Sequence, residues 1–183
     1  MRHAGDPVTG CCGPAVSRTP CIAGSPVLRV VIQRVSRASV TVDGAVTGSA
    51  GTGLAILVGV THSDGSEEVR YLRDKIANLR IFPEDDDDIG FERSALDVGA
   101  DILLISQFTL YASTRKGRRP GFTDAAPGEF SEPLFNELVD AFKETGLRVE
   151  TGVFGAKMLV ELANDGPATF ILDTADRNTP RRG

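Results

Sequence analysis

The chain contains 183 residues, of which 41% are hydrophobic and 25% are charged, with a formal net charge of −5 at pH 7. This length fits one domain that buries a substantial core without disulfides or metals. The acidic balance argues against a protein that coats nucleic acid non-specifically. No apolar run approaches the length of a membrane helix, so we expect a cytoplasmic protein that does not span a membrane.

Residues 1–27 are rich in Gly, Pro and small residues and show neither helical nor strand periodicity. We therefore expect a disordered leader. It lacks the apolar centre of a secretory signal and the Arg-rich amphipathic pattern of a mitochondrial one. All the cysteines lie in it, at Cys11, Cys12 and Cys21. Their position excludes a cysteine nucleophile and a cysteine zinc site in the rest of the chain.

The next part of the chain is predicted to form strands. Strand patterns cover residues 28–35, 38–42 and 53–60, and Asp43-Gly44 is a hairpin signal before a return strand at 45–47. The run at 53–60 is almost entirely apolar, which is typical of a strand buried on both faces.

A helix is predicted to follow, with Ser66 as its cap and an end before Pro83. Its buried face is predicted from the spacing of Val69, Leu72, Ile76 and Leu79. The acidic run 84–88 is predicted to be a solvated loop, because adjacent carboxylates repel one another and lack the spacing of a calcium-binding loop.

Residues 101–111 read D-I-L-L-I-S-Q-F-T-L-Y and are predicted to form a buried strand whose end turns polar. Ser106, Gln107 and Thr109 surround Phe108 at that end. Polar groups that emerge from a buried strand are held rigidly enough to form a site. The alternative is an ordinary strand end whose hydroxyl groups bond to the neighbouring backbone.

A basic loop follows this strand. It carries four cations on a chain that is otherwise acidic, at Arg115, Lys116, Arg118 and Arg119. Such segregated charge suits a small, directed contact with phosphate groups, and a solvated loop without a partner is the alternative.

The remaining elements are one helix and three strands. The helix is predicted to begin at Ser131 and Pro133 and to stop at Gly146, with inward side chains at Leu134, Phe135, Leu138 and Phe142. Strands are predicted over 148–151, 158–163 and 168–172, with a turn at 164–167. Strands that outnumber interspersed helices indicate a mixed α/β single domain with a curled sheet.

Two motifs carry a family resemblance. The S-Q-F-T-L sequence at 106–110, followed by a basic R-P-x-F segment, resembles a signature of the D-aminoacyl-tRNA deacylases, also called D-tyrosyl-tRNA(Tyr) deacylases. A second signature of that family, N-D-G-P-x-T, stands at 164–169, and the segment at 151–158 is similar to its T-G-x-F-[GA]-A-x-M.

The resemblance also sets the predicted domain boundaries. It begins near Leu28, which stands where the family has Met, and continues to about Asp173. We therefore place the domain at 28–173 and a loose tail at 174–183. We also hypothesise that translation starts at Leu28, so that the leader is upstream sequence.

The resemblance implies a fold, an activity and a site. The fold is a barrel-like sheet flanked by two helices and assembled as a homodimer. The activity is hydrolysis of the ester bond of D-aminoacyl-tRNA, and of glycyl-tRNA mischarged on tRNA(Ala), as chiral proofreading without a metal or cofactor. The catalytic residues it implies are Ser106, Gln107, Phe108 and Thr109. The Gly166-Pro167 bond is cis in the family and enters the partner subunit's pocket, where it leaves no room for an L side chain.

The residues themselves favour chemistry that needs little acid–base equipment. His62 is the one histidine outside the leader, and we expect it to be solvated. An aminoacyl ester is already activated, so its hydrolysis mainly requires positioning, water and donors for the developing oxyanion. Backbone N–H groups around Gln107, Phe108 and Thr109 are the expected donors. No base is identifiable beside Thr109, which favours a positioning role over a nucleophilic one.

Two departures from the family pattern stand out. Ala168 replaces the more usual Val, and residues 89–94 replace the K-M-N-x-S segment, so no function is assigned there. Two other function classes stay open. One is a non-catalytic RNA-binding module that uses the basic loop on phosphates and stacks bases on Phe108 or Phe122. The other is a small-molecule esterase, for which the sequence lacks a nucleophile elbow.

Overall fold

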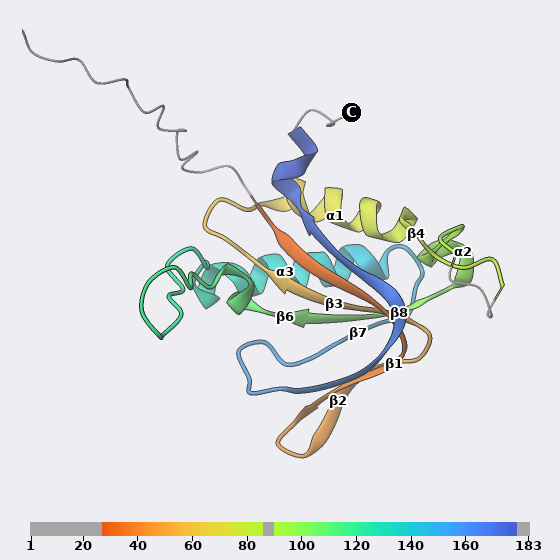
Figure 1. Cartoon of the computed structure of the whole chain (residues 1–183), viewed down its shortest axis with the longest axis horizontal. Coiled ribbons are helices and arrows are strands. Elements are labelled where there is room, and N and C mark those ends of the chain that lie inside the picture. The colour runs from red at the N-terminus through yellow and green to blue at the C-terminus, as the bar shows by residue number, and fades with distance from the viewer. Residues whose placement is uncertain (1–26, 86–89, 179–183) are drawn as a thin grey trace, which may run out of the picture.

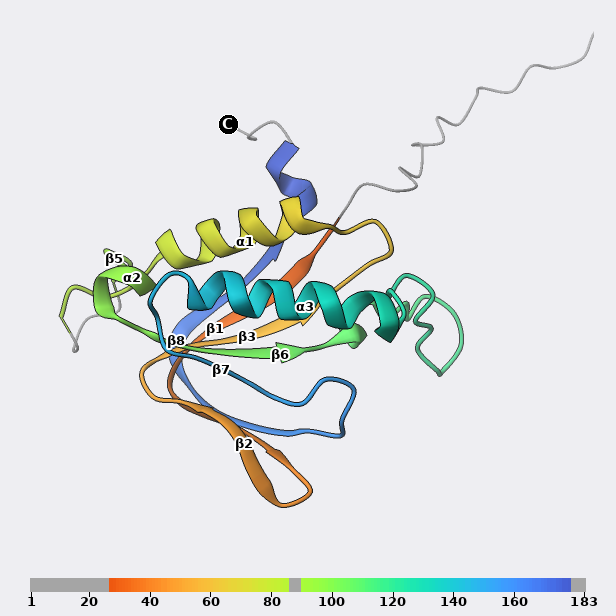
Figure 2. The ribbon, with the colours of Figure 1, turned by 180° about the vertical axis from the view of Figure 1, so that it is seen from behind.

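The computed structural model describes residues 27–85 and 90–178. They form a mixed α/β domain in which a strongly curled sheet approaches a closed barrel and two long helices lie on one of its faces (Figures 1 and 2). The fold class predicted from the sequence is confirmed. The elements in chain order are β1 (Arg29–Val42), β2 (Ala45–Ala50), β3 (Gly53–Gly59), α1 (Ser66–Asn78), β4 (Arg80–Phe82), β5 (Arg93–Ser94), α2 (Ala95–Val98), β6 (Asp101–Ser106), the 3-10 helix η1 (Phe108–Tyr111), α3 (Gly128–Lys143), β7 (Val149–Thr151), β8 (Leu159–Asp173) and the 3-10 helix η2 (Thr174–Asn178).

The sheet is organised around β1. Its strand order is β2-β1-β3-β6-β7, and β8 also pairs with β1. β1 runs antiparallel to β2, β3 and β8, whereas β3, β6 and β7 are parallel to one another. One long strand therefore joins both halves of the sheet, and β4 and β5 form a separate two-stranded ribbon.

The core lies on both faces of the central strands, as their apolar sequences predict. Ile102 and Leu104 pack in the cluster beneath α1 and α3, while Leu103 and Ile105 pack in a second cluster with Val35. Most of the predicted inward residues of the two helices are buried: Val69, Leu72 and Ile76 in α1 and Leu134, Phe135, Leu138 and Phe142 in α3. The exception is Leu79, which is the C-cap of α1 and is only partly buried. Apolar runs in the strands and apolar residues three or four positions apart in the helices thus predicted most of the core correctly.

The helix starts differ from the predictions. The N-cap of α1 is Gly65, whose N–H donates to Glu68 Oε2 (3.0 Å), while the hydroxyl of Ser66 donates to Glu137 on α3 (2.9 Å). α3 begins at Gly128, ahead of the predicted Ser131. The hydroxyl of Ser131 donates backwards to the Pro127 carbonyl (3.0 Å) and so supports a turn that is already helical.

Two predicted strand patterns also change. Residues 28–35 and 38–42 form a single strand, because β1 has partners along its whole length. The predicted turn at 164–167 lies inside β8, where Asn164 pairs with Val35 and Thr169 with Gln33. Four residues of β8 therefore face one residue of β1, and the turn-forming sequence makes a bulge in a continuous strand.

The ends of the domain meet at Leu28. Its N–H donates to Thr174 Oγ1 (2.9 Å), and the Thr174 N–H donates to the Leu28 carbonyl (3.1 Å). Residues 174–178, predicted as part of a tail, form η2. The predicted leader up to residue 26 and most of the acidic run lie outside the described residues. No helix within the described ranges is long and apolar enough to cross a membrane.

Candidate active site

The predicted site sequence changes direction where β6 ends. β6 stops at Ser106, and Phe108–Tyr111 form η1 instead of continuing the predicted strand. The Gln107 N–H donates to the Val58 carbonyl of β3 (2.7 Å). A Cβ on Gly59 would lie 3.0 Å from Leu110 Cβ and 3.2 Å from the Gln107 carbonyl oxygen. Glycine at this position therefore lets η1 fold closely over the end of β3.

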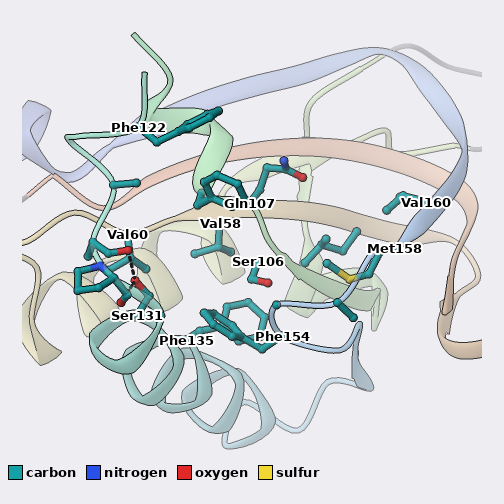
Figure 3. A pocket seen from close by; sticks show the side chains of 18 residues that line it. Val58, Val60, Ser106, Gln107, Phe122, Ser131, Phe135, Phe154, Met158 and Val160 are labelled. Carbon is teal, nitrogen blue, oxygen red and sulfur yellow. Dashed lines mark hydrogen bonds between the residues drawn. The ribbon is translucent and has the colours of Figure 1, made fainter. Parts of the chain in front are cut away.

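A pocket of about 560 Å³ opens beside this change of direction. Figure 3 shows Ser106 pointing into it between the rings of Phe135 and Phe154 and the side chain of Val58. Its lining residues are Val58, Val60, Ile105, Ser106, Gln107, Phe108, Phe122, Ala125, Ala126, Pro127, Gly128, Ser131, Phe135, Phe154, Gly155, Ala156, Met158 and Val160. None of these side chains is an acid, a base or a thiol. The pocket therefore offers shape, apolar contact and backbone groups, and no side chain for general acid–base catalysis.

The backbone at the start of η1 supplies donors next to the pocket. The Leu110 N–H donates to the Gln107 carbonyl (3.2 Å), so the N–H groups of Phe108 and Thr109 precede the first bond of this helix. The first N–H groups of a helix have no partner within it. The Gln107 N–H, which the sequence analysis included among the donors, is used by β3. The donors next to the pocket are therefore those of Phe108 and Thr109.

The predicted catalytic side chains are only partly brought together. Ser106, Gln107 and Phe108 line the pocket, whereas Thr109 does not and is exposed. The Gln107 amide nitrogen donates to the Thr109 hydroxyl. Phe108 is 57% exposed and packs edge-on against Phe122, with ring centroids 5.0 Å apart.

The opposite wall comes from α3 and the loop before β8. The rings of Phe135 and Phe154 lie 6.0 Å apart and close the bottom of the pocket (Figure 3). Phe154, Gly155, Ala156 and Met158 all line it. In the sequence this segment stands out only as a motif, and no role was predicted for it. Its similarity to the family pattern was the signal that it contributes to a site.

The Gly166-Pro167 peptide bond is cis, as the resemblance implied. Both residues are exposed, and neither lines the pocket of its own chain. The bulge that carries them lies beside Arg34, which pairs with Leu54 at the start of β3. The pocket opens at Val58, four residues further along β3. At about 3.3 Å per residue, the two features are separated by roughly 13 Å along the sheet.

Arg34 anchors this segment, and the sequence analysis gave it no role. Its side chain is 1% exposed, and its Nε donates to the Asp165 carbonyl (3.1 Å) and lies 2.9 Å from Asp165 Oδ2. Its Nη1 donates to the Ile81 carbonyl of β4 (2.7 Å). A buried cation with this many oxygen partners fixes the backbone that they belong to. One feature of the sequence pointed to this role. Arg34 follows Ile32 by two residues, so both side chains lie on the same, buried face of β1.

The basic loop is open to solvent. All four predicted phosphate-binding side chains, Arg115, Lys116, Arg118 and Arg119, are exposed. Reciprocal backbone hydrogen bonds between Ser113 and Gly121 (2.7 and 2.9 Å) close the base of the loop. The loop is followed in the sequence by Phe122, which lines the pocket.

Two groups with raised pKa values, Asp64 and Tyr111, do not line the pocket. Burial raises the pKa of the Asp64 carboxyl to about 6, although Asp64 Oδ2 accepts the Thr61 N–H at 2.7 Å. Burial also raises the pKa of Tyr111. Arg29 lies over the Tyr111 ring and donates to the Leu110 carbonyl (3.2 Å), which ties η1 to β1.

No conventional hydrolase arrangement is present in the described part of the chain. His62 is exposed, and its Nε2 lies 3.1 Å from the Thr123 carbonyl, which excludes it from a catalytic triad with Ser106. No group of three His, Cys, Asp or Glu side chains within the described ranges is arranged to hold a metal ion.

Comparisons with known proteins identify the family of this chain. The sequence model of the family described as D-Tyr-tRNA(Tyr) deacylase matches residues 31–173. A D-aminoacyl-tRNA deacylase of Roseiflexus castenholzii is 53% identical over 154 residues, which cover 84% of this chain and 97% of the relative. One from Kineococcus radiotolerans is 54% identical over 147 residues, which cover 80% of this chain and 99% of the relative.

Solved structures give the same result for the fold. A structure titled c-Myc DNA Unwinding Element Binding Protein has a TM-score of 0.72 and 37% identity, covering 84% of this chain and 99% of its own. A probable eukaryotic D-amino acid tRNA deacylase has a TM-score of 0.70 at 18% identity, covering 80% and 99%, and shares the fold. Together with the site motifs, the matches over most of the domain show that this chain belongs to the D-aminoacyl-tRNA deacylases, which are hydrolases of the D-aminoacyl-tRNA ester bond.

Proposed function

We propose that this deacylase works by positioning and backbone hydrogen bonding, without acid–base or nucleophilic side chains. The observation that carries this proposal is the absence of any titratable group among the pocket-lining residues of the described chain. The ester carbonyl would lie at the start of η1, where the N–H groups of Phe108 and Thr109 can donate to the developing oxyanion. Ser106 and Gln107 would orient the ester and the terminal ribose.

We also propose that the working unit is a homodimer. Gly166 and Pro167 do not line the pocket of their own chain, so their backbone acts on the substrate only if a second copy brings them to it. Two features support self-association. β8 pairs with β1 along one edge only, and it exposes the apolar side chains of Leu159 and Ile171. Long unpaired strand edges with exposed apolar residues are characteristic protein contact surfaces.

Chirality would then be read by backbone atoms of the partner's Gly-Pro segment. A D side chain points away from this segment, whereas an L side chain collides with it. Glycine has no side chain to exclude, so glycyl-tRNA mischarged on tRNA(Ala) would also be hydrolysed.

The basic loop would bind the tRNA itself. Arg115, Lys116, Arg118 and Arg119 are exposed, and the chain continues from them to Phe122, which lines the pocket. The acceptor end of a tRNA that enters the pocket brings its phosphates to this loop. Contacts of this kind add affinity that is independent of tRNA sequence and sensitive to salt.

The test compares deacylation of D-Tyr-tRNA, L-Tyr-tRNA and Gly-tRNA(Ala) by the wild-type chain and by Thr109→Ala. We expect hydrolysis of the D and glycyl esters, resistance of the L ester, and measurable turnover by Thr109→Ala, because this change removes a hydroxyl and keeps the backbone donors. A folded Thr109→Ala variant that binds substrate but does not turn it over would favour a threonine nucleophile. Equal rates on the D and L esters would rule out a chiral filter.

A further inference from the structure

Phe91 lies between β4 and β5, in the segment to which the sequence analysis assigned no function. Its side chain is 45% exposed. Among the described residues, the ring interacts with the guanidinium carbon of Arg34, 5.9 Å from the ring centroid, and with the Phe170 ring of β8, whose centroid is also 5.9 Å away at an interplanar angle of 78°. Phe91 therefore joins the β4–β5 segment to both β1 and β8.

β4 holds the ring and the guanidinium together. The Glu92 N–H donates to the Phe82 carbonyl (2.9 Å), which fixes the backbone next to Phe91. The preceding carbonyl of the same strand, that of Ile81, accepts Arg34 Nη1 at 2.7 Å. Two consecutive residues of β4 thus set the position of Phe91 over Arg34.

Arg34 carries this arrangement to the Gly-Pro segment. Its Nε contacts both the carbonyl and the carboxylate of Asp165, the residue before Gly166. The Asp165 side chain is 49% exposed, so water competes with the ion pair from that side. A ring over the guanidinium attracts the cation and keeps water away from it. Less water around the ion pair means a stronger attraction between its charges.

We propose that Phe91 is a positioning residue for deacylation, which covers the Arg34 guanidinium and thereby holds residues 165–167 in the geometry that distinguishes D from L substrates. This inference rests on the proposed role of Gly166 and Pro167 as the chiral filter. Phe91 does not line the pocket, and it acts through Arg34.

The test uses three changes of Phe91 and one matched control. Phe91→Ala removes the ring, Phe91→Leu keeps apolar volume without the ring, and Phe91→Tyr keeps the ring. Leu96→Ala is the control, because Leu96 is an apolar residue of similar exposure (40%) on α2, which packs against β4 and β5. For each variant, kcat and KM are measured on D-Tyr-tRNA and L-Tyr-tRNA, together with the thermal unfolding midpoint.

We expect Phe91→Ala and Phe91→Leu to lower kcat on the D ester roughly tenfold, the change that corresponds to losing a shielded cation–π contact. The ratio of D to L rates should fall with kcat, while KM changes little. Phe91→Tyr should keep both kcat and the ratio of D to L rates at their wild-type values. Leu96→Ala should match the wild type, which separates the positioning role from a general loss of stability.

A coupling measurement identifies the route. If Phe91 acts through the Arg34–Asp165 pair, Phe91→Ala should have a smaller effect in an Asp165→Asn background than in the wild type. Fully additive effects would overturn the inference, as would wild-type kcat and D/L ratio in Phe91→Ala and Phe91→Leu. If those two variants and the wild type all discriminate equally, only this inference fails. If the wild type itself hydrolyses both esters alike, the proposed chiral filter fails and takes this inference with it.

Discussion

The pocket and the Gly-Pro segment are built in opposite ways. The pocket lies at the ends of parallel strands and the start of α3, and its lining is neutral and largely apolar. The Gly-Pro segment lies on a bulge of β8, and a buried arginine holds it by an ion pair and hydrogen bonds. One region provides space and donors, while the other provides rigid backbone. In the mechanism we propose, catalysis depends on both, because positioning has to replace acid–base side chains.

The largest expected effect comes from removing the anchor of the Gly-Pro segment. Arg34→Ala leaves the Asp165 carboxylate and the Ile81 carbonyl without their partner and opens a hole in the domain. Leaving the buried Ile81 carbonyl unsatisfied costs about 1–3 kcal/mol, and losing the ion pair with the half-exposed Asp165 carboxylate adds up to about 1 kcal/mol. We expect a fall in the free energy of unfolding of that order, measured with urea, and loss of D/L discrimination in the deacylation assay.

Arg34→Lys is the matched control for charge. It keeps the cation but lacks the planar group that reaches Asp165 and Ile81 together. Its stability and discrimination should lie between those of the wild type and of Arg34→Ala. An Arg34→Ala variant with wild-type discrimination would mean that the bulge keeps its geometry without the buried cation.

The second prediction disturbs the pocket and leaves the Gly-Pro segment intact. An added methyl group in Gly59→Ala meets Leu110 Cβ and the Gln107 carbonyl, so η1 must shift by a few tenths of an ångström. Since small misplacements of catalytic groups are costly, we expect kcat to fall roughly tenfold. The D/L ratio should remain that of the wild type, because the partner's segment is unchanged.

Gly51→Ala provides the control for this change, because its Cβ would make an ordinary contact with Asp101 Oδ2 at 3.5 Å. It should have wild-type kinetics. Equal falls in kcat and in the D/L ratio for Gly59→Ala would mean that the pocket and the chiral filter are not separable.

The sequence predicted the regular parts of both regions more fully than their irregular parts. Alternation identified β1, and the apolar runs identified β3 and β6, because burial on one or both faces leaves a direct pattern. The end of β6 was not predicted, because the turn into η1 depends on the contact with Gly59 of β3. The bulge in β8 was read as a turn, because Asn, Asp, Gly and Pro favour turns and only the pairing with β1 keeps them in a strand.

The site residues divide in the same way. Ser106, Gln107 and Phe108 were identified from the motif and do line the pocket, but Thr109 was expected beside them and is turned away by η1. Arg34 and Phe91 were not identified, because their roles depend on contacts between β1, β4 and β8 that are distant in the sequence. Local patterns give the elements, and the partners of a buried charge emerge only when those elements are packed.

The third prediction concerns Asp64, which belongs neither to the pocket nor to the Gly-Pro segment. The pKa of Asp64 is raised from 3.8 to about 6, so the folded chain holds this proton more tightly than the unfolded chain. The free energy of unfolding therefore falls as pH rises from about 4 to about 6. Above that range the ionised Asp64 carboxylate lowers it by a constant amount. Asp64→Asn should be more stable relative to the wild type at pH 8 than at pH 4, by about 1–2 kcal/mol.

Urea unfolding of both proteins at the two pH values measures this difference. Deacylation by Asp64→Asn should equal that of the wild type at pH 8, because Asp64 does not line the pocket. A stability difference that is the same at both pH values would contradict the assigned titration.

The smallest expected effect concerns the basic loop. Arg118 is exposed and does not line the pocket, so Arg118→Ala should weaken binding to all tRNAs by a similar, modest factor. The slope of log affinity against log salt should flatten by about one unit. Glu129→Ala, an exposed change of opposite charge at the start of α3, is the control and should not flatten the slope. Unchanged affinity and slope in Arg118→Ala would make the loop a solvated surface.

The most direct test asks whether the pocket and the Gly-Pro segment of different subunits form one site. Ala126→Phe fills the pocket, and Gly166→Val disturbs the bulge, where an added Cβ would lie 2.8 Å from the Asn164 amide. Each variant alone should be nearly inactive on D-Tyr-tRNA. After subunit exchange, mixed dimers contain one intact site, so an equal mixture should recover about a quarter of the wild-type rate.

The mirror mixture is the control. A chain that carries both changes, exchanged with the wild type, should leave about a quarter of the wild-type rate, whereas sites contained within single chains would leave about half. Our account predicts recovery in the first mixture and the lower value in the second. Activity in the first mixture that stays at the mean of the two inactive variants, with half the rate in the second, would contradict a site shared between subunits.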